Sequence, residues 1–97
     1  MFWEAIMERL AVLHEILAGR APSDVFRRIF AADSSMSNSR LGEMLADEFV
    51  ELDSLAEQLV WRWMGPGKTQ GLSDANLDGL LLSIFRDSGY SVPDWSK

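Results

Sequence analysis

Apolar residues recur along this chain at intervals of three and four, which is the spacing of one face of an α-helix. In residues 2–18 they form a stripe that stops before Gly19, and glycine is common where helices end. The stripe consists of Trp3, Ile6, Leu10, Leu13 and Leu17. Phe2, Val12 and Ile16 widen it beyond the needs of a one-sided surface helix. We therefore expect this helix to lie centrally or to be shared with a second copy.

The same periodicity predicts four further helices. Their expected bounds are residues 24–31, 40–52, 54–64 and 74–88, followed by an irregular tail at 89–97. No stretch alternates as a β-strand would. The 97 residues suffice for one domain, so the sequence predicts a single all-α domain over 1–97. We expect four to five short helices in a compact bundle.

Local signals indicate where the helices begin and end. Ser23, Ser73 and either Ser37 or Ser39 are placed to cap helix starts, because a serine oxygen accepts a hydrogen bond from the free N–H groups there. Ser54 and Glu57 match the S-x-x-E capping box. At the last helix end, Gly89 predicts a stop after which Tyr90 folds back on Phe85.

The stretch GPGKTQGLSDANLDG (65–79) suggests two ligand sites, and both fail on spacing. A phosphate-binding loop ending at Gly67-Lys68-Thr69 needs a glycine where Arg62 stands, and a preceding strand. A calcium loop starting at Asp74 needs a bidentate glutamate at its twelfth position, which is Phe85. We interpret the stretch as a helix stop, a turn and a capped restart.

Enzymatic chemistry finds no support in the residue types. The chain has one histidine, His14, which lies beside the apolar stripe, and it has no cysteine. Acidic residues are plentiful, but the sequence identifies no pair of carboxylates in an apolar pocket that would separate their pKa values. We therefore predict no catalytic residues, no cofactor and no metal site. The lack of cysteine, and an N-terminus unlike a secretory signal, lead us to expect a cytoplasmic protein.

The net charge of −6 argues against nucleic acid as a partner, since binding to phosphates needs a basic surface. No apolar run is long enough to cross a membrane. Two short helices around residue 53 leave a helix-turn-helix DNA-binding regulator as an alternative, although the second would present only Arg62 to the phosphates. Arg20, Arg27 and Arg28 are the basic cluster, and they could pair with an acidic surface of another copy.

Two features point to a protein partner. Residues 43–57 hold six acids and no base, and Glu43, Asp47 and Glu51 are spaced to stack along one ridge of the predicted helix at 40–52. Trp61 falls about 160° from the middle of the apolar stripe of its helix, so it is either an exposed interface anchor or packed under the 65–71 loop or the tail.

These features predict a small acidic inhibitor or adaptor that binds a basic surface on another protein. Its predicted partner-binding residues are Glu43, Asp47, Glu48, Glu51 and Trp61. A structural homo-oligomer, with the first helix and Trp61 buried between copies, is the alternative from another class.

Overall fold

Helices make up the regular secondary structure of residues 11–66 and 69–92, the part of the chain that the computed structural model describes. A helical segment at 11–14 is followed by α2 (Pro22–Ala32), α3 (Asn38–Glu48), α4 (Leu55–Arg62) and α5 (Asp74–Asp87). No β-strand occurs in these residues, so the prediction of a small all-α bundle is confirmed. The predicted residues 2–10 of the first helix, and residues 93–97 of the tail with Trp95, lie outside the described ranges.

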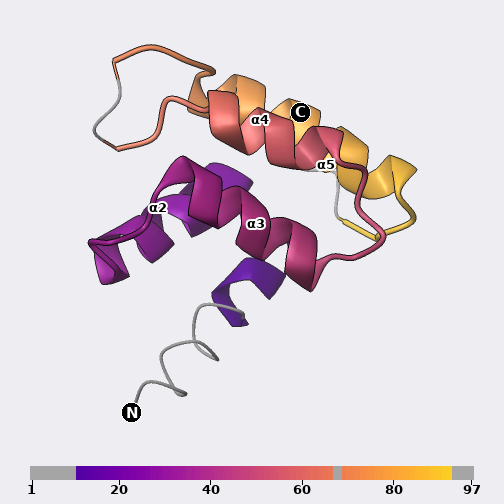
Figure 1. Ribbon diagram of the computed structural model, residues 1–97. Helices are drawn as coiled ribbons and strands as arrows, with labels where there is room; N and C mark the ends of the chain where they lie inside the picture. The colour runs from indigo at the N-terminus through magenta and orange to yellow at the C-terminus, as the bar shows by residue number, and fades with distance from the viewer. Residues whose placement is uncertain (1–10, 67–68, 93–97) are drawn as a thin grey trace.

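The helices pack as two pairs, α3 with α4 and α2 with α5, and α4 also contacts α5 (Figure 1). α3 and α4 form a hairpin, and α5 runs back along α4 and also packs on α2. The loop between α4 and α5 is closed at its base by two backbone bonds, from Met64 N–H to Leu72 O and from Leu72 N–H to Arg62 O.

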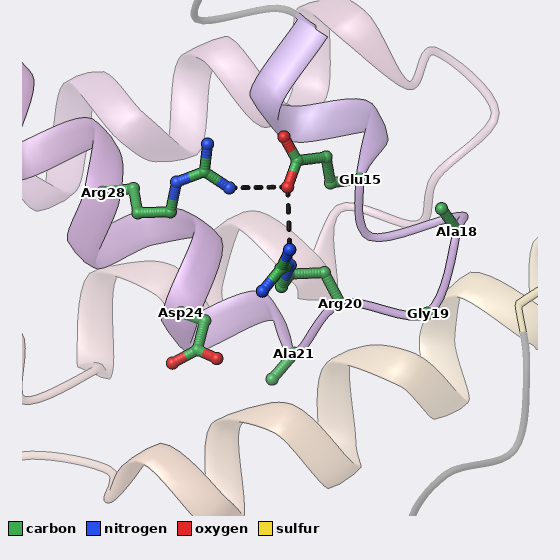
Figure 2. Close-up of a pocket in the computed structure, with 7 residues that line it drawn as sticks. All are labelled: Glu15, Ala18, Gly19, Arg20, Ala21, Asp24 and Arg28. Atoms are coloured by element: carbon green, nitrogen blue, oxygen red, sulfur yellow. Dashed lines mark hydrogen bonds and ion pairs between the residues drawn. The ribbon is translucent and has the colours of Figure 1, made fainter.

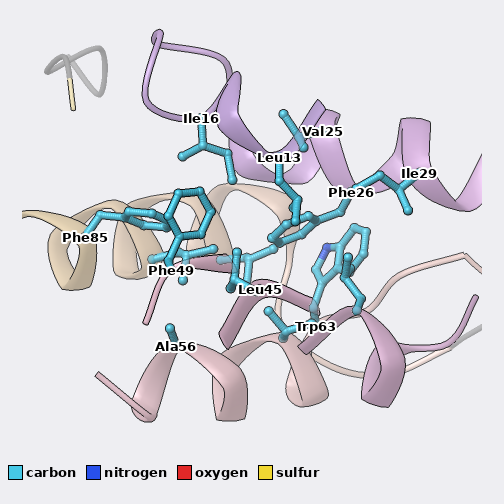
Figure 3. Packing of buried hydrophobic residues seen from close by; sticks show 14 of the residues in the cluster. Leu13, Ile16, Val25, Phe26, Ile29, Leu45, Phe49, Ala56, Trp63 and Phe85 are labelled. Atoms are coloured by element: carbon cyan, nitrogen blue, oxygen red, sulfur yellow. The ribbon is translucent and has the colours of Figure 1, made fainter. Parts of the chain in front are cut away.

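One hydrophobic core joins all of these elements (Figure 3). Trp63, Phe26, Phe49 and Phe85 are its largest fully buried side chains. The Trp63 ring meets Phe26 edge-on with ring centroids 5.7 Å apart, and Phe49 meets Phe85 in the same way at 5.0 Å. Phe26 and Phe85 lie in α2 and α5, whereas Trp63 and Phe49 directly follow α4 and α3, so the aromatic contacts tie the two helix pairs together.

Three of the predicted helix ends are confirmed. Ser37 and Ser73 cap α3 and α5, each accepting a bond from the N–H group three residues later. Gly89 has a positive φ of 97°, and the N–H of Tyr90 bonds to Phe85 O, five residues back. The rings of Tyr90 and Phe85 then lie 5.6 Å apart, as the fold-back prediction requires.

The predicted capping roles of Ser23 and Ser54 are wrong. α2 begins at Pro22, with Ala21 as its N-cap, so Ser23 already lies inside the helix. Ser54 makes no capping bond from its side chain, and the carboxylate of Asp53 instead accepts the N–H of Leu55. The capping box with Glu57 therefore does not form.

Two helices end four residues earlier than the periodicity predicts. α3 stops at Glu48 rather than at residue 52, and Phe49 nevertheless remains buried. The first helical segment gives way after His14 to turns in which N–H groups bond three residues back, and these turns continue to Gly19. In both places the apolar residues keep a spacing close to that of a helix after the α-helix has ended. The periodicity therefore predicted helices that are longer than the observed ones.

Candidate protein-binding surface

The predicted acidic residues of α3 divide into two groups. Glu43 and Asp47 are exposed and lie one turn apart on α3, and Glu51 is exposed in the connection that follows. The prediction that the three acids form one ridge on a single helix is therefore wrong for Glu51, which lies beyond the end of α3. None of these three carboxylates has an ion pair with a described residue.

Glu48 has a structural partner. Its Oε2 atom lies 2.5 Å from Nε2 of His14, and the His14 ring packs 5.0 Å from the ring of Phe49. This contact holds the first helical segment against the end of α3. Of the four acids predicted to face a partner, Glu48 is thus the one already engaged within the chain.

Trp61 lies on the exposed side of the α3–α4 hairpin with 48% of its surface accessible. Its ring rests on α3 at Gly42, where an added Cβ would lie 3.0 Å from both Trp61 Nε1 and Glu57 Cγ. A larger residue at position 42 would push these side chains away. Gly42 therefore allows α4 to approach α3 closely and lets the Trp61 ring rest on α3 at the residue before Glu43.

Two more large apolar side chains are exposed along the hairpin. Val50 and Leu55 lie in the α3–α4 connection and at the start of α4, on either side of Glu51 and Asp53. Single exposed apolar residues are ordinary on protein surfaces. Here they alternate with carboxylates, so this edge of the hairpin carries both apolar and acidic groups.

The predicted basic cluster is neutralised within the chain. Arg28 donates from Nη1 to Glu15 Oε1 at 2.6 Å, and Arg20 Nε lies 3.5 Å from the same oxygen. Both interactions are drawn as dashed lines in Figure 2. These residues and Asp24 line an open hollow of about 800 Å³, in which both arginines pair with Glu15. Arg27 pairs elsewhere, so each arginine of the cluster has a carboxylate in its own chain.

The residues that resembled a calcium loop form part of the contact between α2 and α5. Asp74 accepts bonds from Arg27 Nη2 at 2.8 Å, from Arg27 Nε at 3.1 Å and from the Trp63 indole at 2.9 Å. The hydrogen bonds from Arg27 hold the pKa of Asp74 below its ordinary range. The Arg27 guanidinium also lies 5.3 Å from the centre of the Trp63 ring.

Asp78 is buried one turn further along α5, with 7% of its surface accessible. Its two carboxylate oxygens accept the backbone N–H of Ser23 at 2.7 Å and the hydroxyl of Ser23 at 2.8 Å. Burial raises the pKa of Asp78, because removal from water disfavours the charged form. Ser23 is at the first turn of α2, so Asp78 caps that helix from 55 residues away.

Sequence reasoning missed the polar contacts of both aspartates, since nothing local marks Arg27 and Ser23 as their partners. In the described ranges, no three histidine or acidic side chains are grouped so that they could hold a metal ion. None of the helices described is both long and apolar enough to cross a membrane. No protein family, curated protein or solved structure is significantly similar to the chain.

Proposed function

We propose that the chain is a small non-catalytic protein-binding domain, an inhibitor or adaptor that engages a basic surface of a partner protein in the cytoplasm. The observation that carries this proposal is the pairing of unneutralised carboxylates with an exposed aromatic side chain. Glu43, Asp47 and Glu51 have no ion pair among the described residues, and the half-exposed Trp61 packs on Gly42, the residue that precedes Glu43 on α3.

Each part of this surface has a physical role in binding. Like charges one turn apart on a helix are destabilising by a few tenths of a kcal/mol, which a cationic partner would relieve. The negative field also speeds the encounter with such a partner. Tryptophan loses little conformational entropy on binding and buries a large area, which is why it is frequent among the residues that dominate binding energy.

The shifted carboxylates support the non-catalytic part of the proposal. The pKa values of Asp74 and Asp78 depart from the ordinary range. Their oxygens are occupied by Arg27, Trp63 and Ser23, and these bonds hold α2 against α5 and the end of α4. Both residues thus have a structural task.

The experiment is a quantitative affinity purification from the native host with the wild-type chain and two variants. Asp47→Lys changes the net charge by two within the acidic surface. Ala75→Lys/Ser83→Lys makes the same change in net charge at exposed positions of α5. We expect the captured proteins to be basic and their capture to weaken as salt is added. Asp47→Lys alone should reduce their recovery several-fold.

The two variants separate a local surface from general charge. Equal depletion by both would mean that only net charge matters, and no depletion by Asp47→Lys would contradict the assignment of this surface. Far-UV circular dichroism of each variant confirms that the helices are intact before the comparison.

A further inference from the structure

An open hollow of about 480 Å³ lies next to Trp61, between the end of α2, the start of α3 and the beginning of the α4–α5 loop. Phe30, Met36, Trp61 and Pro66 give it apolar walls, and the polar residues 37–39 line the remaining side. Its volume lies within the range of pockets that bind small ligands and side chains.

The walls of the hollow are held in place by the fold. The Phe30 ring packs edge-on against buried Trp63 with centroids 5.9 Å apart. The side-chain amide of Asn38 donates to the backbone carbonyls of both Val60 and Trp63, each at 2.9 Å, and so fixes the start of α3 to the end of α4. A preformed site of this kind costs little conformational entropy when it is filled.

Negative charge increases in one direction from the hollow. Glu57 lies one turn before Trp61 on α4, and Glu43 lies one turn after Ser39 on α3, where Ser39 and Trp61 both line the hollow. Asp47 follows after another turn. The dipole of α3 has the same sense, because its positive end is at residues 37–39 and its negative end is near Asp47. A cationic group of an occupant is therefore favoured at the acidic end.

We infer that the hollow receives an apolar side chain from a short extended segment of the partner, whose arginine or lysine residues lie along α3. Turns of α3 rise about 5.4 Å, and alternate side chains of an extended chain are about 6.6 Å apart. The segment therefore carries its basic residues two and four positions from the apolar one, opposite Glu43 and Asp47. This inference rests on the proposed function and specifies the chemistry of the partner.

The test begins with selection of short random peptides displayed on phage against the purified chain. We expect the enriched peptides to combine one large aliphatic or aromatic residue with arginine or lysine at the second and fourth positions from it. The best peptide is then synthesised, together with a version in which serine replaces the apolar residue at unchanged charge. We expect the serine version to bind about tenfold more weakly.

A matched pair of protein variants locates the apolar residue. Ser39→Trp places a large side chain in the hollow at an exposed serine, and Ser83→Trp makes the same change at an exposed serine of α5. Ser39→Trp should weaken binding of the apolar peptide about tenfold and leave the serine version unaffected, whereas Ser83→Trp should change neither. In the wild-type chain, the apolar peptide should also shift the indole N–H resonance of Trp61, assigned with Trp61→Phe.

The outcomes distinguish this inference from the proposed function. Selected peptides that are basic but lack an apolar residue, or a Trp61 resonance that does not move, would overturn the hollow as a binding site and leave the acidic surface standing. Selection that yields no basic peptides would overturn both.

Discussion

The buried pair of Ser23 and Asp78 gives the sharpest test of how this fold is held together. Replacing Asp78 by alanine removes both acceptors, and the N–H and hydroxyl of Ser23 then remain in a site where Ser23 is 4% exposed. A buried polar group without a partner costs about 1–3 kcal/mol. Relief of the carboxylate's own desolvation offsets part of this loss, so we expect Asp78→Ala to lower the free energy of unfolding by about 1–3 kcal/mol.

Asparagine at the same position should behave differently. Its carbonyl oxygen can keep the bond from the Ser23 N–H, and its amide can donate to the Ser23 hydroxyl after that hydroxyl has rotated. It also carries no charge in a site whose burial raises the pKa of Asp78. We therefore expect Asp78→Asn to change the free energy of unfolding by less than about 1 kcal/mol at neutral pH.

The raised pKa of Asp78 also predicts how the stability of Asp78→Asn relative to wild type changes with pH. A carboxyl group whose pKa is raised on folding destabilises the native state when it is ionised. For Asp78 this destabilisation grows as pH rises from the ordinary value of 3.8 through the raised pKa. Below 3.8 the wild-type group is protonated in both states. The stability of Asp78→Asn relative to wild type should therefore increase with pH over that window and then level off.

Urea unfolding followed by far-UV circular dichroism measures these differences at several pH values. A loss of 1 kcal/mol corresponds to a melting temperature lower by about 4–8 °C for a domain of this size. The reasoning is refuted if Asp78→Asn costs as much as Asp78→Ala at neutral pH, or if its relative stability falls as pH rises. In a double-mutant cycle, Ser23→Ala should cost less in the Asp78→Ala background than in wild type.

Three further predictions follow from local geometry. Gly79→Ala should raise the free energy of unfolding by about 0.5–1 kcal/mol in urea titrations, since no atom lies within 4 Å of the added Cβ in the α5 interior; a loss would contradict the open space. Gly71→Ala should cost more than about 2 kcal/mol in the same assay, because φ is +139° and the Cβ would lie 2.3 Å from Arg62 O; near-neutral behaviour would contradict this geometry. The lowered pKa of Asp74 gives a stabilisation that is lost as pH falls from 3.8 through the folded-state pKa. Arg27→Gln should make the melting temperature fall less steeply as pH is lowered below 3.8. An unchanged pH dependence of the melting temperature would rule out Arg27 as the source of this stabilisation.

Features set by neighbours in the sequence could be predicted from the sequence. Ser37 and Ser73 cap the N–H group three residues later, and Gly89 has a conformation that most other residues avoid. Such interactions are complete within one turn, so tertiary packing has little influence on them. The all-α fold is predictable for the same reason, because its apolar spacing is local.

Features that depend on distant partners could not be predicted. Ser23 has the sequence context of a helix cap, but its hydroxyl donates to Asp78. At the start of α4, the carboxylate of Asp53 rather than the hydroxyl of Ser54 accepts a backbone N–H, that of Leu55. In the candidate surface, the helical angle of Trp61 placed it off the apolar stripe, but the sequence does not show that Gly42 supports its ring. The engagement of Glu48 by His14 across 34 residues likewise has no local signal.

The cap that α5 provides for α2 also bears on the order of events during synthesis. Ser23 precedes Asp78 by 55 residues, and at about 5–20 residues per second the ribosome adds that length in roughly 3–11 s. Throughout this interval the first turn of α2 lacks its acceptor, and for the earlier part of it, until Trp63 has been made, Phe26 also lacks the ring that packs edge-on against it. The first turn of α2 therefore gains its full set of hydrogen-bond partners only after synthesis has reached α5.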